Sequence, residues 1–118
     1  MIQIYTTPSC ASCRKAKKWF DQYKIPYSEK NIFSIKLSKE DIFRMLANSE
    51  NGFDDIISTR SKVFKEKKLD PDNMSVQELI EFIIDYPSVL KRPIIINENE
   101  LQVGYNNEDI TIFLPKEL

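Results

Sequence analysis

The chain has 118 residues, of which 42% are hydrophobic and 11% aromatic. This is enough apolar material for one compact core, and the chain is too short for two ordinary domains. The 17 basic and 18 acidic residues leave a net charge of -1, which excludes the broad phosphate neutralisation behind tight autonomous DNA binding. No window is long and apolar enough to span a membrane, and the N-terminus lacks a signal-peptide pattern. We therefore expect a cytoplasmic protein without membrane contact.

Cys10 and Cys13 are the two cysteines of the chain, and two residues separate them. Structural disulfides are rare in a reducing cytosol, so this spacing indicates either redox chemistry or half of a metal site. Zinc usually takes four Cys, His or carboxylate ligands, and the chain has no histidine and no further cysteine. We therefore favour a redox pair and expect no metal and no cofactor. Two inert buried thiols are the remaining alternative.

The opening of the chain is predicted to form a strand, a turn and a helix. Residues 2–5 alternate in the manner of a short strand, which ends at Thr7-Pro8. The apolar residues that follow recur at helical spacing, and residues 27–31 are predicted as a second strand. We expect three aromatic side chains of the helix in the core: Trp19, Phe20 and Tyr23.

Residues 37–86 are predicted to form several short helices. Ser38 with Asp41, and Ser75 with Glu78, have the spacing of a capping box, which marks the start of a helix. We expect Asn51-Gly52 to end the first of these helices and Ser58 to cap another.

The last part of the chain changes back to strands. Residues 93–96 and 101–104 are typical of a β-hairpin, and a final helix is predicted from Asn106 to Pro115. The whole order predicts an α/β, thioredoxin-like fold with a mixed sheet of about four strands and an inserted helical subdomain. We expect a single domain over residues 1–118, with the thioredoxin-like part at about 1–35 and 88–118 and the helical insertion at about 36–87. Three side chains of the final helix should face the core: Ile110, Phe113 and Leu114.

Cys10 is expected at the start of the first helix. The unpaired N–H groups and the positive end of the helix dipole favour a thiolate there, which makes Cys10 the reactive sulfur. Arg14, Lys15, Lys17 and Lys18 crowd the first turns of the same helix, where cations oppose the dipole. They form either a positive field around a sulfur anion or a solvated basic face. For Arg14 the two interpretations carry equal weight.

Arg92-Pro93 precedes the first strand of the hairpin. We expect this proline in the cis form, which in thioredoxin-like folds lies opposite the Cys-x-x-Cys turn. Arg92 would then face the sulfurs and bind a thiolate, an oxyanion or a partner carboxylate. The alternative is a surface arginine paired with an acid. Arg60 either serves the same region or begins a helix, and Gly52 either ends a helix or lets another backbone approach closely.

Five stretches carry a resemblance to a known family: YTTPSCASCRKA at 5–16, NIFS at 31–34, IISTRSKVF at 56–64, RPIII at 92–96 and LQVGYN at 101–106. The chain resembles the ArsC/Spx family nearly from end to end. Within that family it is similar to the Spx branch, redox-responsive regulators of low-GC Gram-positive bacteria that bind RNA polymerase. Together the stretches are far more specific than a lone Cys-x-x-Cys.

The resemblance implies a thioredoxin-like, ArsC-type fold and a global transcriptional regulator. It implies binding to the C-terminal domain of the RNA polymerase α subunit, with Gly52 at the contact and promoter DNA reached only through the polymerase complex. Oxidation of Cys10 and Cys13 to a disulfide would activate thiol-stress genes and interfere with other activators. We expect a monomer. The resemblance assigns three more residues to the polymerase or promoter complex: Arg60, Lys62 and Arg92.

Two features depart from the family pattern. Lys91 stands where these regulators tend to carry a second arginine, which keeps the charge but loses bidentate pairing. The sequence ends at Leu118, whereas family members usually continue into a tail recognised by the ClpXP protease. Either the sequence is shortened or this proteolytic control is absent.

An ArsC-type arsenate reductase or a thiol oxidoreductase is the alternative function. Such an enzyme would use Cys10 as nucleophile, with Arg60 and Arg92 holding the oxyanion. ArsC enzymes carry a third arginine in the hairpin region, where this chain has Val103-Gly104-Tyr105. Cys13 would also divert Cys10 into an internal disulfide by thiol exchange. We therefore expect that the chain is not an enzyme.

Overall fold

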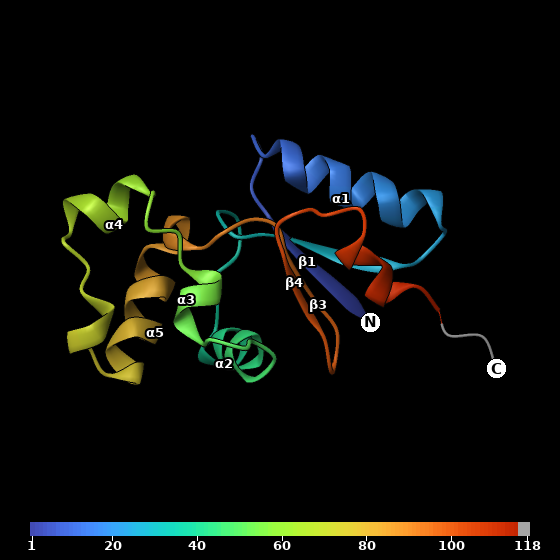
Figure 1. Cartoon of the computed structure of the whole chain (residues 1–118). Coiled ribbons are helices and arrows are strands. Elements are labelled where there is room, and N and C mark those ends of the chain that lie inside the picture. Colours follow the sequence, from blue (N-terminus) through green and yellow to red (C-terminus); the bar gives the residue numbers. More distant parts are fainter. Residues whose placement is uncertain (116–118) are drawn as a thin grey trace. The chain divides into compact units, whose positions relative to one another are not determined.

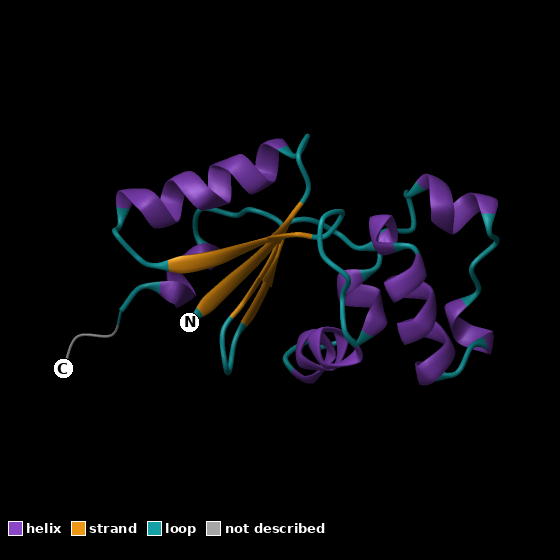
Figure 2. Cartoon of the chain, turned by 180° about the vertical axis from the view of Figure 1, so that it is seen from behind, coloured by secondary structure: helices purple, strands orange, loops and turns teal. Residues whose placement is uncertain are grey.

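The computed structural model describes residues 1–115. The chain divides into two compact units, one made of Met1–Asn31 with the chain from Arg92 onward, and one made of Ile32–Lys91. The named strands all belong to the first unit, whereas helices and loops make up the second (Figure 2). That the two units form one ArsC/Spx-like domain stays a prediction. Among the described residues, no helix has both the length and the apolar character needed to cross a membrane.

A four-stranded mixed sheet with the order β2-β1-β3-β4 organises the first unit (Figure 1). β1 pairs with β2 in parallel, and β3 pairs with both β1 and β4 in antiparallel fashion. This architecture confirms the predicted α/β, thioredoxin-like fold class. The elements are β1 (Ile2–Thr6), α1 (Ala11–Gln22), β2 (Tyr27–Asn31), β3 (Ile94–Ile96), β4 (Leu101–Val103) and the 3-10 helix η3 (Asp109–Phe113).

The core of the first unit lies between the sheet and α1. Ile4 of β1 lies opposite Ile95 of β3, and both belong to one buried cluster with side chains of α1 and η3. The apolar residues of α1 reach this cluster because they repeat at helical spacing and so share one face of the helix. The members from the two helices are Ala16, Trp19, Phe20, Ile110 and Phe113.

Two core predictions for this unit are wrong. Tyr23 is 50% exposed, because α1 ends at Gln22 and the ring lies over Trp19 with the centroids 4.8 Å apart. Leu114 is 36% exposed, because the last helix is a short 3-10 helix that ends at Phe113 and does not carry Leu114 on its buried face.

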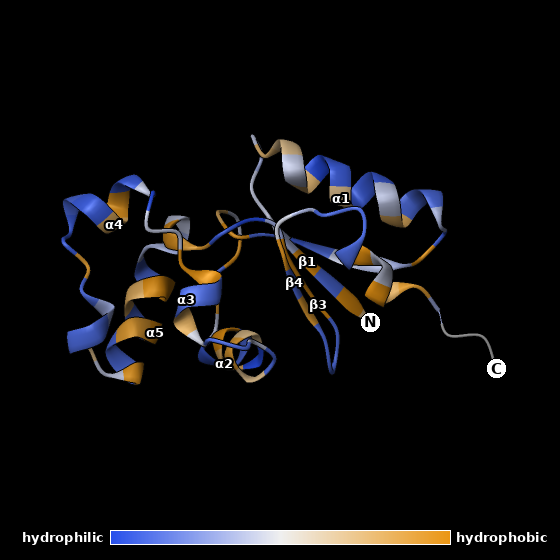
Figure 3. Cartoon of the chain, viewed as in Figure 1, coloured by the Kyte–Doolittle hydropathy of each residue, from blue (hydrophilic) through white to orange (hydrophobic). Residues whose placement is uncertain are grey.

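The second unit is a set of short helices. Both predicted capping boxes are present, at Ser38 with Asp41 and at Ser75 with Glu78. α2 and α5 pack against each other, and the ribbon of α5 alternates between hydrophobic and hydrophilic turns (Figure 3). The elements are α2 (Lys39–Ala47), α3 (Phe53–Ile56), α4 (Lys62–Glu66), η1 (Pro71–Asn73), α5 (Val76–Asp85) and η2 (Pro87–Val89).

Two helix ends in this unit differ from the prediction. Ser61, not Ser58, caps α4, and its hydroxyl accepts a hydrogen bond from the Phe64 N–H at 3.1 Å. Ser58 instead donates its N–H to the Val89 carbonyl at 2.7 Å, beside an isolated β-bridge. The helix α2 ends at Ala47, where the side chains of Asn48 and Ser49 donate to carbonyls of its last turn. Gly52 therefore does not end α2.

Candidate functional site

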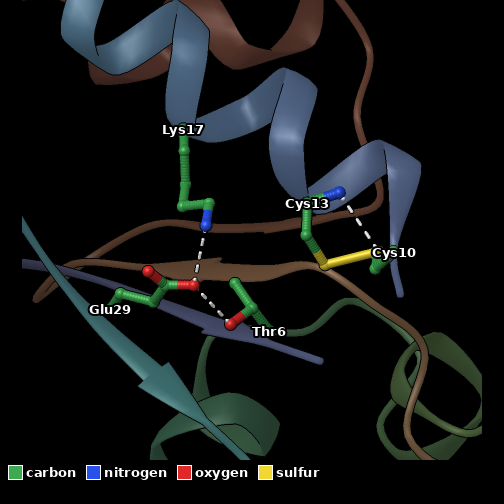
Figure 4. The surroundings of a disulfide bond; sticks show 5 residues. All are labelled: Thr6, Cys10, Cys13, Lys17 and Glu29. Atoms are coloured by element: carbon green, nitrogen blue, oxygen red, sulfur yellow. Dashed lines mark hydrogen bonds and ion pairs between the residues drawn. A yellow bond between two sulfur atoms is a disulfide. The ribbon is translucent and has the colours of Figure 1, made fainter. Parts of the chain in front are cut away.

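The cysteine turn connects β1 to α1. Cys10 is the N-cap of α1, in an extended conformation with φ of -108°, and Cys13 lies in the first turn of the helix. The two sulfurs form a disulfide, and their Cα atoms are 5.2 Å apart. The N–H of Cys13 also donates to the Cys10 sulfur at 3.1 Å (Figure 4). The sequence prediction that the first helix begins near Cys10 is confirmed, because α1 begins at Ala11 with Cys10 as its N-cap.

The two sulfur-bearing residues differ in accessibility. Cys13 is 1% exposed, whereas Cys10 is partly exposed at the start of the helix. A thiolate that attacks the disulfide from solvent therefore reaches Cys10. The N–H that Cys13 donates to the Cys10 sulfur, at the positive end of the helix dipole, is a contact of the kind that favours a thiolate over a thiol.

Lys17 does not act as an isolated cation beside the cysteines. Its ammonium lies 3.0 Å from the Glu29 carboxylate, which also accepts a hydrogen bond from the buried Thr6 hydroxyl at 2.8 Å (Figure 4). Burial raises the pKa of Glu29, but the hydrogen bonds from Lys17 and Thr6 outweigh this effect and leave the pKa lowered. Arg14, Lys15 and Lys18 are exposed, as a solvated basic face requires.

Sequence reasoning missed Thr6 and Glu29. The two side chains meet because β2 pairs with β1 in parallel, with Ile4 opposite Glu29 and Thr6 opposite Asn31. Nothing in the local pattern of either strand gives this register. The available signal was the alternation of β1, which places Thr6 on the same face as Ile2 and Ile4, where a buried hydroxyl would need a partner.

Arg92-Pro93 is a cis peptide bond at the start of β3, as predicted. Tyr5 lies opposite Ile94, so this peptide lies next to the end of β1 from which the cysteine turn departs. Arg92 is partly buried, and this burial lowers the pKa of its guanidinium. That Arg92 faces the sulfurs stays a prediction.

The hairpin ends at the same edge of the sheet. Gly104 follows β4 with φ of +80°, and its N–H donates to the Pro93 carbonyl at 2.8 Å. Val103-Gly104-Tyr105 therefore brings a backbone turn, and not a guanidinium, to the place where ArsC enzymes are expected to carry a third arginine.

Gly52 belongs to the second unit and precedes α3. Its backbone has φ of +65° and ψ of -131°, a conformation that side-chain-bearing residues rarely adopt. A Cβ atom at this position would meet nothing within 4 Å among residues 1–115. The glycine is therefore required by the backbone and not by close packing within the described chain, and the space above it is open.

Asp55 holds the loop that contains Gly52. One carboxylate oxygen accepts the N–H groups of Glu50 and Asn51, each at 2.9 Å, and the Asn51 side chain donates to the other oxygen at 3.3 Å. The backbone hydrogen bond from Asn51 is the main cause that lowers the pKa of Asp55, and with the other donors it outweighs the opposite effect of burial. This contact was also missed from the sequence.

An Asp55→Ala variant is expected to lower the free energy of unfolding by about 1 kcal/mol, because two backbone N–H groups lose their acceptor. Since the folded pKa is lowered, the stabilisation is complete above the unfolded pKa of about 3.9 and is lost as the pH falls through the folded value. Urea unfolding of wild type and Asp55→Ala at neutral and acid pH measures this. A difference between the two that does not shrink in acid contradicts the assignment.

Arg60 and Lys62 lie in the second unit, on either side of the Ser61 cap. Arg60 is exposed in the turn before α4. The Lys62 side chain is 85% exposed and forms only a loose pair with Glu66, at 3.5 Å along the helix. Arg60 therefore precedes a helix, and both cations are open to a partner. Within residues 1–115, no group of His, Cys, Asp or Glu could hold a metal ion.

The sheet order and the disulfide at the start of α1 define a thioredoxin-like protein with a Cys-x-x-Cys pair. The model of the ArsC family matches residues 5–113. The Global transcriptional regulator Spx 1 of Bacillus cereus is 51% identical to this chain over 98% of it and 88% of the relative. The Global transcriptional regulator Spx of Bacillus subtilis (strain 168) is 48% identical over 100% of this chain and 90% of the relative. The chain belongs to the ArsC family, in its Spx branch.

A solved structure gives the same fold. The arsenate reductase from Vibrio cholerae superposes with a TM-score of 0.86 over 96% of this chain and 97% of that one, at 19% sequence identity. At this identity the likeness concerns the fold alone.

Proposed function

We propose that the chain is a redox-responsive global transcriptional regulator of the cytoplasm that binds the C-terminal domain of the RNA polymerase α subunit. The Cys10–Cys13 pair is the switch, and oxidation favours activation of thiol-stress genes and interference with other activators. The observation that carries the proposal is the disulfide at the start of α1, in a chain 48% identical over its full length to a regulator named Spx.

The cysteine geometry supports a switch. Cys10 is open to oxidants and thiols, while Cys13 is buried within disulfide distance of it. Once the disulfide forms, Cys10 has no free thiol until a reductant opens the pair, so the oxidised state lasts until it is reduced. In this proposal the disulfide is a signal and not a step in a catalytic cycle.

The partner surface in this proposal includes Gly52, where the backbone is bare and the space above it open. Arg60 and Lys62 add exposed positive charge from the same unit. Arg92 from the first unit is assigned to the polymerase or promoter complex. With a net charge of -1, the chain reaches promoter DNA only through the polymerase complex. ClpXP is a further partner wherever a C-terminal tail is present.

The direct test is a binding titration of the purified chain with the C-terminal domain of the polymerase α subunit, in oxidised and dithiothreitol-reduced form. We expect saturable binding to this domain, and transcription of thiol-stress promoters that is stronger with the oxidised form. An absence of binding in both forms would overturn the function.

An enzyme assay on the same preparation tests the alternative. Arsenate reduction with glutathione and glutaredoxin is expected to stay at background, because the hairpin supplies Val103-Gly104-Tyr105 in place of an arginine. Measurable turnover that depends on Cys10 would reverse the ranking of the two functions.

A further inference from the structure

A small polar network lies beside the disulfide and joins three elements of the first unit. Thr6 of β1 is 2% exposed and donates to Glu29 Oε2 at 2.8 Å. Lys17 of α1 donates to the same oxygen at 3.0 Å. Figure 4 shows Thr6 between the Glu29 carboxylate and the two sulfurs. A positive and a negative charge are therefore held together about one helical turn beyond Cys13.

The fold explains this placement. Ile4 packs with Ala16 and faces α1, so Thr6, two residues further along β1, faces the helix as well. Because β1 and β2 are parallel, α1 runs back along the sheet, and Thr6 lies under the start of the helix. Lys17 follows Cys13 by four residues, just over one helical turn, or about 6 Å along the axis. The network is therefore close to the buried sulfur.

We propose that the Lys17–Glu29 ion pair, anchored by Thr6, sets the redox equilibrium of the Cys10–Cys13 pair by cancelling the Lys17 charge beside the sulfurs. The inference rests on the proposed redox switch and names the residues that regulate it. It concerns the chain alone, so its test needs no polymerase. A negative result would disprove this inference without disproving the proposed binding to the polymerase.

Reduction by a dithiol shows which charge matters. One thiolate of the reductant attacks the Cys10 sulfur, the S–S bond breaks, and the electron pair stays on Cys13, which takes a proton from water. The second thiolate of the reductant attacks the mixed disulfide, leaving Cys10 as a thiolate and the reductant as a cyclic disulfide. Two electrons pass to the protein. Of the two protons that the dithiol loses, one ends on Cys13 and one in the solvent.

The product therefore carries a negative charge on Cys10 that the disulfide lacks. A free ammonium nearby stabilises this thiolate and makes the disulfide easier to reduce, whereas a free carboxylate does the opposite. With both present and in contact, the two effects largely cancel. The pair thus prevents the Lys17 charge from favouring the reduced form of the cysteines.

Two single variants and their combination test the proposal. The equilibrium constant for reduction is measured against dithiothreitol redox buffers, and the Cys10 thiol pKa from the pH dependence of alkylation. Glu29→Gln, which frees the Lys17 charge, should raise the equilibrium constant about threefold and lower the thiol pKa. Lys17→Met, which frees the Glu29 charge, should lower the constant about threefold and raise the thiol pKa. The double variant should return close to wild type.

Opposite changes of the equilibrium constant in the two single variants distinguish an electrostatic effect on the cysteines from a merely structural role of the ion pair. If the pair only held α1 to the sheet, both single variants would lower the free energy of unfolding and move the redox constant in the same direction or not at all. Lys18→Met is the matched control, because it removes the neighbouring, exposed cation of the same helix, which lies outside the Lys17–Glu29 pair. A shift with Lys18→Met as large as that with Lys17→Met, or same-sign shifts in the two single variants, would overturn the proposal.

Discussion

A Gly52→Arg variant is expected to bind the C-terminal domain of the polymerase α subunit at least about a hundredfold more weakly than wild type, a loss of about 2.7 kcal/mol. A Cβ atom added at Gly52 meets nothing within 4 Å among residues 1–115, so an arginine there projects outward into the volume that a docked partner would fill. Loss of close approach at the centre of an interface has effects of this size. Isothermal titration with the purified domain measures it.

Two control variants distinguish the effect of side-chain volume at Gly52 from the effect of backbone strain on binding. Gly52→Ala places a side chain on the same φ of +65° but adds little volume. Because the backbone strain is the same, Gly52→Ala and Gly52→Arg should lower the free energy of unfolding by similar amounts. Gly52→Ala should nevertheless bind the polymerase domain more tightly than Gly52→Arg. Gly104→Arg adds the same charge at φ of +80°, again with open space around an added Cβ atom, but in the other unit. Binding that survives Gly52→Arg, or that Gly104→Arg weakens as much, would place the contact elsewhere.

The two cysteines are expected to react at very different rates once reduced. In a Cys13→Ala variant, Cys10 should be alkylated by iodoacetamide about a hundredfold faster at neutral pH than Cys13 is in a Cys10→Ala variant. Cys10 caps α1 and is partly exposed, so its thiolate is both stabilised and accessible. Cys13 is 1% exposed, and burial in apolar surroundings disfavours the thiolate.

Denaturant supplies the control for this comparison. In concentrated guanidinium chloride the two single-cysteine variants should react at nearly equal rates, because the helix and the burial are both gone. Folded-state rates within a factor of about two of each other would show that burial and capping do not distinguish the sulfurs.

Features governed by neighbouring residues were predictable from the sequence. The capping boxes at Ser38 and Ser75 depend on a hydroxyl and an acid three residues apart, and both are present. The N-cap of α1 at Cys10 follows from a short motif in the same way. Such contacts form within one helical turn, so the local pattern is enough to predict them. The cis bond at Arg92-Pro93 was predictable for another reason, because it was expected from the thioredoxin-like fold as a whole.

Features that depend on register or on competing local bonds were not predictable. The contact of Thr6 with Glu29 needs the alignment of β2 on β1, which no single strand specifies. Gly52 was expected to end α2, but side chains closer to that helix satisfy its last carbonyls first. Asp55 then holds the loop before Gly52. This contact could be predicted only if the turn of the chain between Asn51 and Asp55 were already known. The partner-binding role of Gly52 stays a prediction, because an open surface alone does not specify what binds to it.

The position of Cys13 next to Cys10 also protects Cys10 from irreversible oxidation under the oxidative stress that the protein would sense. A peroxide that reaches Cys10 converts it to a sulfenic acid, and further oxidation to sulfinic acid is irreversible for most proteins. Here the Cys13 sulfur lies within bonding distance, since the Cα atoms are 5.2 Å apart. It can condense with the sulfenic acid, with loss of water, before a second oxidant arrives. Reduction of the disulfide then restores the same protein molecule. Each cycle of oxidation and reduction therefore uses up oxidant and reducing thiol, but the protein is not lost.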